Sequence, residues 1–150
     1  SKGFISQLES NQTSPSLSTL EDILTTLGSS FHEFFSDEQG DDPVCRKEDV
    51  FVKEDDGVTI HWLIPNAQKK DIEPILVTLQ PGAKTETDLP HMGEEFGYVL
   101  SGAVTLELGG KSYRVRKGDS FSFKPSQQHD LKNTGKTPAT VIWVCTPPNF

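Results

Sequence analysis

The sequence has few basic residues, and almost none of them lie near its beginning. Its 150 residues hold 14 Lys and Arg against 22 Asp and Glu, which gives a net charge of -8. The first forty residues contain one base, Lys2, and six acids, which are Glu9, Glu21, Asp22, Glu33, Asp37 and Glu38. Because phosphate contacts require Lys or Arg, we expect weak nucleic-acid binding from this segment on its own.

Cysteine is also scarce. The two cysteines, Cys45 and Cys145, are one hundred residues apart, and this spacing matches no zinc or redox motif. We expect reduced thiols, as in a cytoplasmic protein, and a long-range disulfide between the two remains the alternative.

Long apolar runs are missing as well. No stretch approaches the roughly 20 apolar residues that cross a bilayer, and the N-terminus lacks the basic and hydrophobic regions of a secretory signal. Hydrophobic residues make up 33% of the chain and the mean hydropathy is -0.45. We therefore expect a cytoplasmic protein with no membrane partner, large enough for one small barrel and a fragment of another unit.

Residues 1–36 have the pattern of short helices. Ser18 and Glu21 have the spacing of a capping box, and Gly28 stands where a helix end favours a left-handed residue. The apolar positions between them follow a 3.6-residue period: Leu17, Leu20, Ile23, Leu24 and Leu27. Residues 37–43 are acidic and contain Gly and Pro, which predicts a linker.

From residue 44 the apolar period changes to two. Gly109-Gly110 suits a two-residue hairpin turn, and residues 117–119 and 133–136 have turn composition. The alternating positions are Val58, Ile60, Trp62 and Ile64, then Ile75, Val77 and Leu79, then Val104, Leu106 and Leu108, and finally Ala139, Val141, Trp143 and Cys145. Residues 44–150 are therefore predicted to form a mainly β, antiparallel sandwich or barrel, preceded by a short α-helical segment.

The opening stretch SKGFISQLESNQTSPSLSTLEDILTTLG resembles the Cro/repressor-like (XRE-type) helix-turn-helix family. The resemblance implies that the chain begins at a recognition helix, without the first two helices of that family's DNA-binding unit. It places Ile5 and Leu8 toward a hydrophobic core. The side chains directed at operator DNA would be those of Ser1, Lys2, Ser6 and Gln7.

The stretches PGAKTETDLPHMGEEFGYVLSG and GDSFSFKPSQQHDLKN resemble the two motifs of the cupin superfamily, which implies a cupin barrel over residues 44–150. Metal-binding cupins have His-x-His and Glu in the first motif and a third His in the second. On this resemblance His91, Glu95 and His129 match three ligands. Leu89 replaces the first His and cannot bind a metal.

Two histidines and one carboxylate suit Fe(II), or a weaker site for Zn, Ni or Mn. The alternative is a metal-free pocket in which His91, Glu95 and His129 bind an organic effector or one another. Tyr98 shares the strand phase of Phe96 and Leu100, and we expect it to line this pocket beside the three.

The order of the two resemblances predicts a DNA-binding transcriptional regulator and not an enzyme. In this interpretation the cupin domain senses a small-molecule effector and forms a homodimer on operator DNA. One alternative is a metal-dependent cupin enzyme, of the isomerase or dioxygenase type, that uses the two histidines and the glutamate. Another is a dimerisation barrel that binds no ligand.

Overall fold

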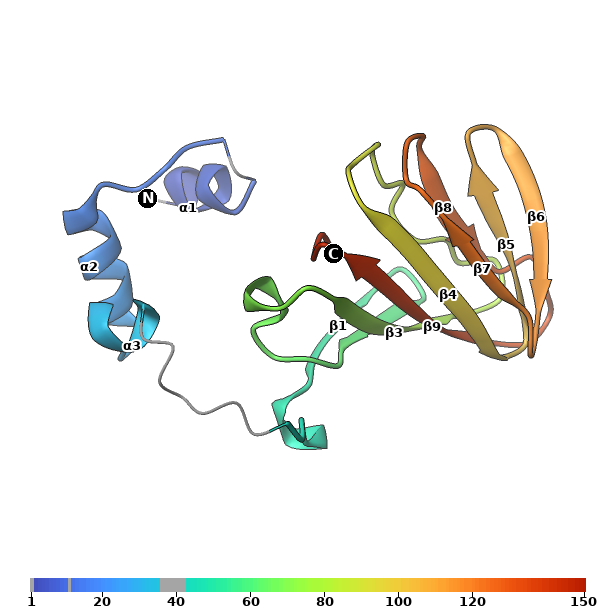
Figure 1. Ribbon diagram of the computed structural model, residues 1–150, viewed down its shortest axis with the longest axis horizontal. Helices are drawn as coiled ribbons and strands as arrows, with labels where there is room; N and C mark the ends of the chain where they lie inside the picture. The colour runs from blue at the N-terminus through green and yellow to red at the C-terminus, as the bar shows by residue number, and fades with distance from the viewer. Residues whose placement is uncertain (1, 11, 36–42) are drawn as a thin grey trace. The chain divides into compact units, whose positions relative to one another are not determined.

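The computed structural model describes residues 2–10, 12–35 and 43–150, and the chain divides into two compact units between Pro43 and Val44 (Figure 1). The first unit is helical. The second consists of antiparallel strands. Among the described residues no helix has the length and apolarity needed to span a membrane.

The helical unit contains α1 (Lys2–Glu9), α2 (Leu17–Thr26) and α3 (Phe31–Phe35). The capping box predicted at Ser18 and Glu21 is wrong, because the N-cap of α2 is Ser16, whose Oγ accepts the backbone N–H of Thr19 over 3.2 Å. The end of α2 is as expected. Gly28 has a φ of +74° there, and its N–H donates to the Thr25 carbonyl.

The second unit is a two-sheet antiparallel jelly roll, which confirms the predicted fold class. Its backbone hydrogen bonds join the strands into two separate sheets and not into one continuous barrel. The larger sheet has the order β1 (Phe51–Asp55), β2 (Val58–Trp62), β3 (Glu73–Leu79), β9 (Ala139–Thr146), β4 (Glu94–Ser101) and β7 (Ser120–Phe123). The smaller sheet has the order β6 (Lys111–Arg116), β5 (Ala103–Leu108) and β8 (His129–Lys132).

The core lies between the inner faces of the two sheets. Alternate residues of β3 and β9 point inward and are buried, as the two-residue period predicts. The buried cluster combines both sheets and includes Ile75, Val77, Leu79, Val99, Val104, Leu106, Leu131, Val141 and Trp143.

Two hairpin turns follow directly from their residue types. Gly109 and Gly110, between β5 and β6, have φ values of +57° and +79°, which residues with a Cβ rarely adopt. Asp56 and Gly57 make the equivalent turn between β1 and β2, with φ values of +41° and +78°. The turn at Gly109-Gly110 was predicted from the sequence.

The segment from Lys84 to Asp88 runs antiparallel along β8 and extends the smaller sheet. It forms isolated bridges to β8 at Lys84–Lys132 and at Asp88–His129. At the second bridge each residue donates its N–H to the carbonyl of the other, over 2.9 and 3.2 Å. This pairing fixes the backbone of Asp88 beside His129.

Candidate functional site

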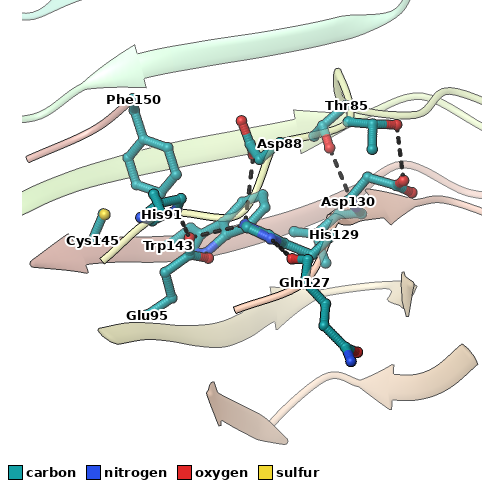
Figure 2. A network of polar contacts seen from close by, with 12 residues as sticks. Thr85, Asp88, His91, Glu95, Gln127, His129, Asp130, Trp143, Cys145 and Phe150 are labelled. Carbon is teal, nitrogen blue, oxygen red and sulfur yellow. Dashed lines mark hydrogen bonds and ion pairs between the residues drawn. The ribbon is translucent and has the colours of Figure 1, made fainter. Parts of the chain in front are cut away.

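His91, Glu95 and His129 meet inside the jelly roll (Figure 2). Glu95 points inward from β4, His129 begins β8, and His91 lies in the loop before β4. Glu95 Oε1 lies 2.9 Å from the Nε2 atoms of both histidines. Glu95 and His129 are fully buried, and His91 is partly buried. The structure thus brings together the three residues that the sequence singled out.

The outer nitrogen of each ring fixes its tautomer. His91 Nδ1 lies 3.0 Å from the Met92 carbonyl oxygen, and His129 Nδ1 lies 3.0 Å from that of Gln127. A carbonyl oxygen only accepts, so each Nδ1 carries a hydrogen, and a neutral ring then has its lone pair on Nε2. Two lone pairs therefore converge on Glu95 Oε1, which is itself an acceptor when ionised.

Three acceptor atoms that lie within 4.8 Å of one another require a cation among them. Histidines that bind metals usually donate their other N–H to a carbonyl or a carboxylate, as both rings do here. The donor set thus fits a divalent transition metal. Without a metal, protons meet the same requirement. Burial lowers the pKa of His129, but its hydrogen bonds with Glu95 and Gln127 outweigh burial and raise that pKa above its ordinary value.

The second oxygen of Glu95 is held by β9. The indole Nε1–H of Trp143 donates to Glu95 Oε2 over 2.7 Å, and both side chains are buried. The carboxylate is therefore fixed in orientation, with one oxygen facing the histidines.

Asp88 is a member of this site that the sequence analysis missed. Its Oδ2 lies 3.8 Å from His129 Nε2, and its pKa is raised, mainly by burial, against the lowering effect of His129. Leu89, the residue that motif spacing assigns to the missing histidine, is 68% exposed. The sequence signal that could have identified Asp88 is that this carboxylate directly precedes Leu89.

A pocket of about 490 Å³ adjoins the cluster. Trp62, Trp143, Phe150, Ile60 and Val77 form an apolar wall, and charged side chains, including that of Asp88, line another part of the pocket. Asp88 and Trp143 contact both the pocket and the cluster, because they also bind His129 and Glu95.

Tyr98 does not line this pocket, so its predicted role is wrong. Side chains alternate along β4, and Glu95 points inward, so Phe96 and Tyr98 point outward and are 45% and 39% exposed. Glu94 is also exposed, and it accepts a hydrogen bond from Ser122 Oγ.

The predicted DNA-contacting residues are described only in part. Ser1 and the side chain of Lys2 lie outside the described residues. Ser6 and Gln7 are exposed on α1, as expected for side chains that reach a ligand. Ile5, which was expected to face a core, is 42% exposed.

The two cysteine thiols are free, so the alternative of a long-range disulfide does not hold. Cys45 is exposed, whereas Cys145 is buried at the inner face of β9. Burial, with smaller contributions from Glu95 and Glu73, raises the pKa of Cys145 to about 12.

Two facing antiparallel sheets around a His-Glu-His cluster are the features of a cupin domain, and the family profile described as "Cupin domain" matches residues 75–145. Over 149 residues the chain is 32% identical to the HTH-type transcriptional regulator PuuR of Escherichia coli. The matched residues make up 97% of this chain and 80% of that protein. The chain therefore belongs to the family of HTH-type transcriptional regulators that includes PuuR.

Solved structures show the same fold. An HTH_3 family transcriptional regulator from Vibrio cholerae is 24% identical, covers 99% of this chain and 82% of its own, and has a TM-score of 0.59. A predicted oxalate decarboxylase from Thermotoga maritima is 20% identical, covers 69% of this chain and 97% of its own, and has a TM-score of 0.60.

Proposed function

We propose that this chain is a DNA-binding transcriptional regulator, active in the cytoplasm, whose cupin domain senses a small-molecule effector. The observation that carries this proposal is the similarity to PuuR, which extends over 97% of the chain and so includes both structural units. In this account α1 is the recognition helix. Ser1, Lys2, Ser6 and Gln7 contact operator DNA, and the chain is not an enzyme.

The effector binds in the pocket beside the cluster. A volume of about 490 Å³ suits a small organic molecule. A ligand that contacts Asp88 or Trp143 also acts on His129 and Glu95, through the contacts of 3.8 and 2.7 Å. Through these contacts, a ligand bound in the pocket would change the positions of His129 and Glu95 in the cluster.

We also propose that His91, Glu95 and His129 hold a divalent transition metal ion, with Fe, Zn, Ni and Mn as candidates. The convergence of three acceptor atoms, with both Nδ1 atoms bound to carbonyl oxygens, supports this assignment. A bound ion would supply positive charge and open coordination positions for a ligand. The three side chains would hold the ion in place, and because they are buried or partly buried they would exclude water from that side of it.

The homodimer forms through the outer face of the larger sheet. An antiparallel sheet normally exposes polar side chains on its solvent face. Here Glu94, at the start of β4, is the one charged residue among the outward residues of the three adjacent strands β3, β9 and β4. The others are Pro74, Leu76, Thr78, Thr140, Ile142, Val144, Thr146, Phe96, Tyr98 and Leu100. Two chains with a charge of -8 each approach with least repulsion at such a face, so a second copy is its proposed occupant.

The alternative function is a metal-dependent cupin enzyme. The observation in its favour is that three protein ligands leave coordination positions open for a substrate. The similarity to a regulator over nearly the whole chain favours sensing over catalysis.

The test is a selection of genomic DNA fragments with the native protein that carries this sequence. We expect recovery of a few sequences with two-fold symmetry, and we expect Gln7→Ala to change which sequences are recovered. Recovery of no specific sequence, with or without metal, would overturn the proposed function.

A further inference from the structure

The bases of this acidic chain are concentrated in one short stretch. Residues 111–136 contain seven of its 14 Lys and Arg but only two of its 22 Asp and Glu, which are Asp119 and Asp130. The seven bases are Lys111, Arg114, Arg116, Lys117, Lys124, Lys132 and Lys136. Two of the three strands of the smaller sheet, β6 and β8, lie in this stretch. The smaller sheet therefore carries positive charge in a chain whose net charge is -8.

Strand alternation directs Arg114 of β6 and Lys132 of β8 to the outer face of this sheet. Their neighbours Val115 and Leu131 are buried in the core, so the two bases point the other way, and both are exposed. Both pair in register with Thr105 of the central strand β5, from opposite sides. Arg114, Thr105 and Lys132 therefore form one row across the outer face.

No carboxylate neutralises the two bases of this row. Lys84 bridges to Lys132 and extends the row, but its own ammonium forms an ion pair with Asp130 over 3.0 Å. Arg114 Nη1 donates to the hydroxyl oxygen of Thr134 and not to a carboxylate. Within the part of the chain that the structure describes, neither Arg114 nor Lys132 forms an ion pair. Both bases are therefore available to an anionic partner.

Two more bases lie beside the row. Arg116 is two residues beyond Arg114 on β6, so it points to the same side, about 7 Å along the strand. Lys136 follows Gly135 in the turn after β8, and a Cβ at Gly135 would lie 3.9 Å from Arg114 Nη2. We call Arg114, Arg116, Lys132 and Lys136 the basic face. All four are exposed, and the proposed dimer uses the other sheet, so this face stays exposed in the dimer.

The first forty residues supply little of the positive charge that DNA binding requires, because they contain one base and six acids. Contacts of Lys and Arg with phosphates provide much of the affinity of DNA-binding proteins. We propose that the basic face binds the phosphate backbone of DNA. This inference rests on the proposed function as a DNA-binding regulator. In this account α1 reads the base sequence, whereas the basic face adds affinity without sequence preference.

The experiment titrates a fluorescent operator duplex, and an unrelated duplex of the same length, with the native protein at about 50 to 200 mM KCl. The test variant is the double substitution Arg114→Gln, Lys132→Gln. Its charge-matched control is Lys47→Gln, Lys69→Gln, at two exposed bases of the same unit outside the smaller sheet. A third variant, Arg114→Lys, Lys132→Arg, keeps both charges. Circular dichroism checks that each variant folds.

Each phosphate contact contributes a slope of about -0.9 to the logarithm of affinity plotted against the logarithm of salt concentration. We expect the test variant to make this slope shallower by about 1.8 on both duplexes. The control variant and the charge-conserving variant should keep the wild-type slope. Gln7→Ala should differ from the test variant, because it should change binding to the operator and not to the unrelated duplex.

A wild-type slope in the test variant would overturn the inference. An equal change in the control variant would also overturn it, because the total charge of the protein would then set the affinity. Loss of poly-glutamate binding by the test variant, with DNA binding unchanged, would assign the face to an acidic protein instead. If the genomic selection recovers no operator, the regulator proposal fails, while the unrelated duplex still tests the basic face. If the test variant does not fold, Lys132→Gln alone decides, with an expected change of about 0.9.

Discussion

Trp143 donates its indole N–H to Glu95 over 2.7 Å, and through this bond β9 fixes a carboxylate that belongs to β4. The other oxygen of Glu95 is shared by two histidines. One buried acid thus connects the hydrophobic core to the candidate metal site, and the pocket reaches the same indole. A change at Trp143 should therefore affect folding and ion binding together.

The first prediction follows from this bond. Trp143→Phe leaves Glu95 Oε2 buried without its donor, so the free energy of unfolding should fall by about 1–3 kcal/mol from the lost hydrogen bond alone. Metal affinity should fall as well. Urea denaturation and calorimetric titration measure the two effects. Trp62→Phe, which alters an indole on the pocket wall, is the matched control. Equal losses of metal affinity in both variants would contradict this role for the bond.

The second prediction concerns the thiols. At pH 8 a thiol with a pKa of about 12 is ionised only to about one part in ten thousand, so buried Cys145 should resist a thiol reagent. Exposed Cys45 should react quickly. We expect one thiol to be titrated in the folded protein, two in denaturant, and none quickly in folded Cys45→Ser. Rapid modification of both thiols in the folded protein would disprove the burial of Cys145.

The third prediction concerns the outer face of the larger sheet. Ile142 lies in a cross-strand row between Leu76 and Tyr98, so Ile142→Glu places a charge at the centre of the proposed dimer contact. Light scattering should show a dimer for the wild type and a monomer for this variant. Tyr113→Glu, at an exposed position on the other sheet, should remain a dimer. A monomeric wild type, or equal dissociation of both variants, would refute the contact.

The fourth prediction concerns pH. The pKa of His129 is higher in the folded protein than in the unfolded chain. Its contribution to stability is therefore complete below the unfolded value of about 6.5 and is lost as pH rises through the folded value. Metal binding has the opposite dependence, because its ligands must be deprotonated. Added Mn²⁺ should raise the melting temperature more at pH 8 than at pH 6. A smaller rise at pH 8 would show that the histidines do not bind the ion.

The β architecture could be predicted from sequence because its cause is local. Alternation at Ile75, Val77 and Leu79 and the Gly109-Gly110 turn specify an inner face and a hairpin without knowledge of distant residues. His91, Glu95 and His129 were identified because family motifs specify their spacing. Their shared contact at Glu95 Oε1 depends on how distant strands pack, so it could not be predicted from the spacing alone.

The wrong predictions concern positions where the direction of a side chain or the pairing of two backbone segments decides which residue lies at the site. Tyr98 was assigned to the pocket although it lies at odd spacing from Glu95, and strand alternation turns it outward. The residue spacing of the family motif assigns the missing histidine to position 89, which is Leu89. In the structure the backbone pairing with β8 places Asp88, and not Leu89, beside His129. The N-cap at Ser16 depends on which of several nearby hydroxyls accepts the Thr19 N–H, and sequence alone does not rank them.

We propose that the cupin cluster controls how this protein acts on its operator DNA. The direct measurement is a cellular reporter driven by an operator from the DNA selection, compared across growth media for wild type, Glu95→Gln and Glu94→Gln. Glu94 is the matched control because it precedes Glu95 on β4 and faces outward. We predict that Glu94→Gln responds as wild type does, while Glu95→Gln binds the operator but holds the reporter at one level in every medium. A wild-type response from Glu95→Gln would show that the cluster does not control the action on DNA.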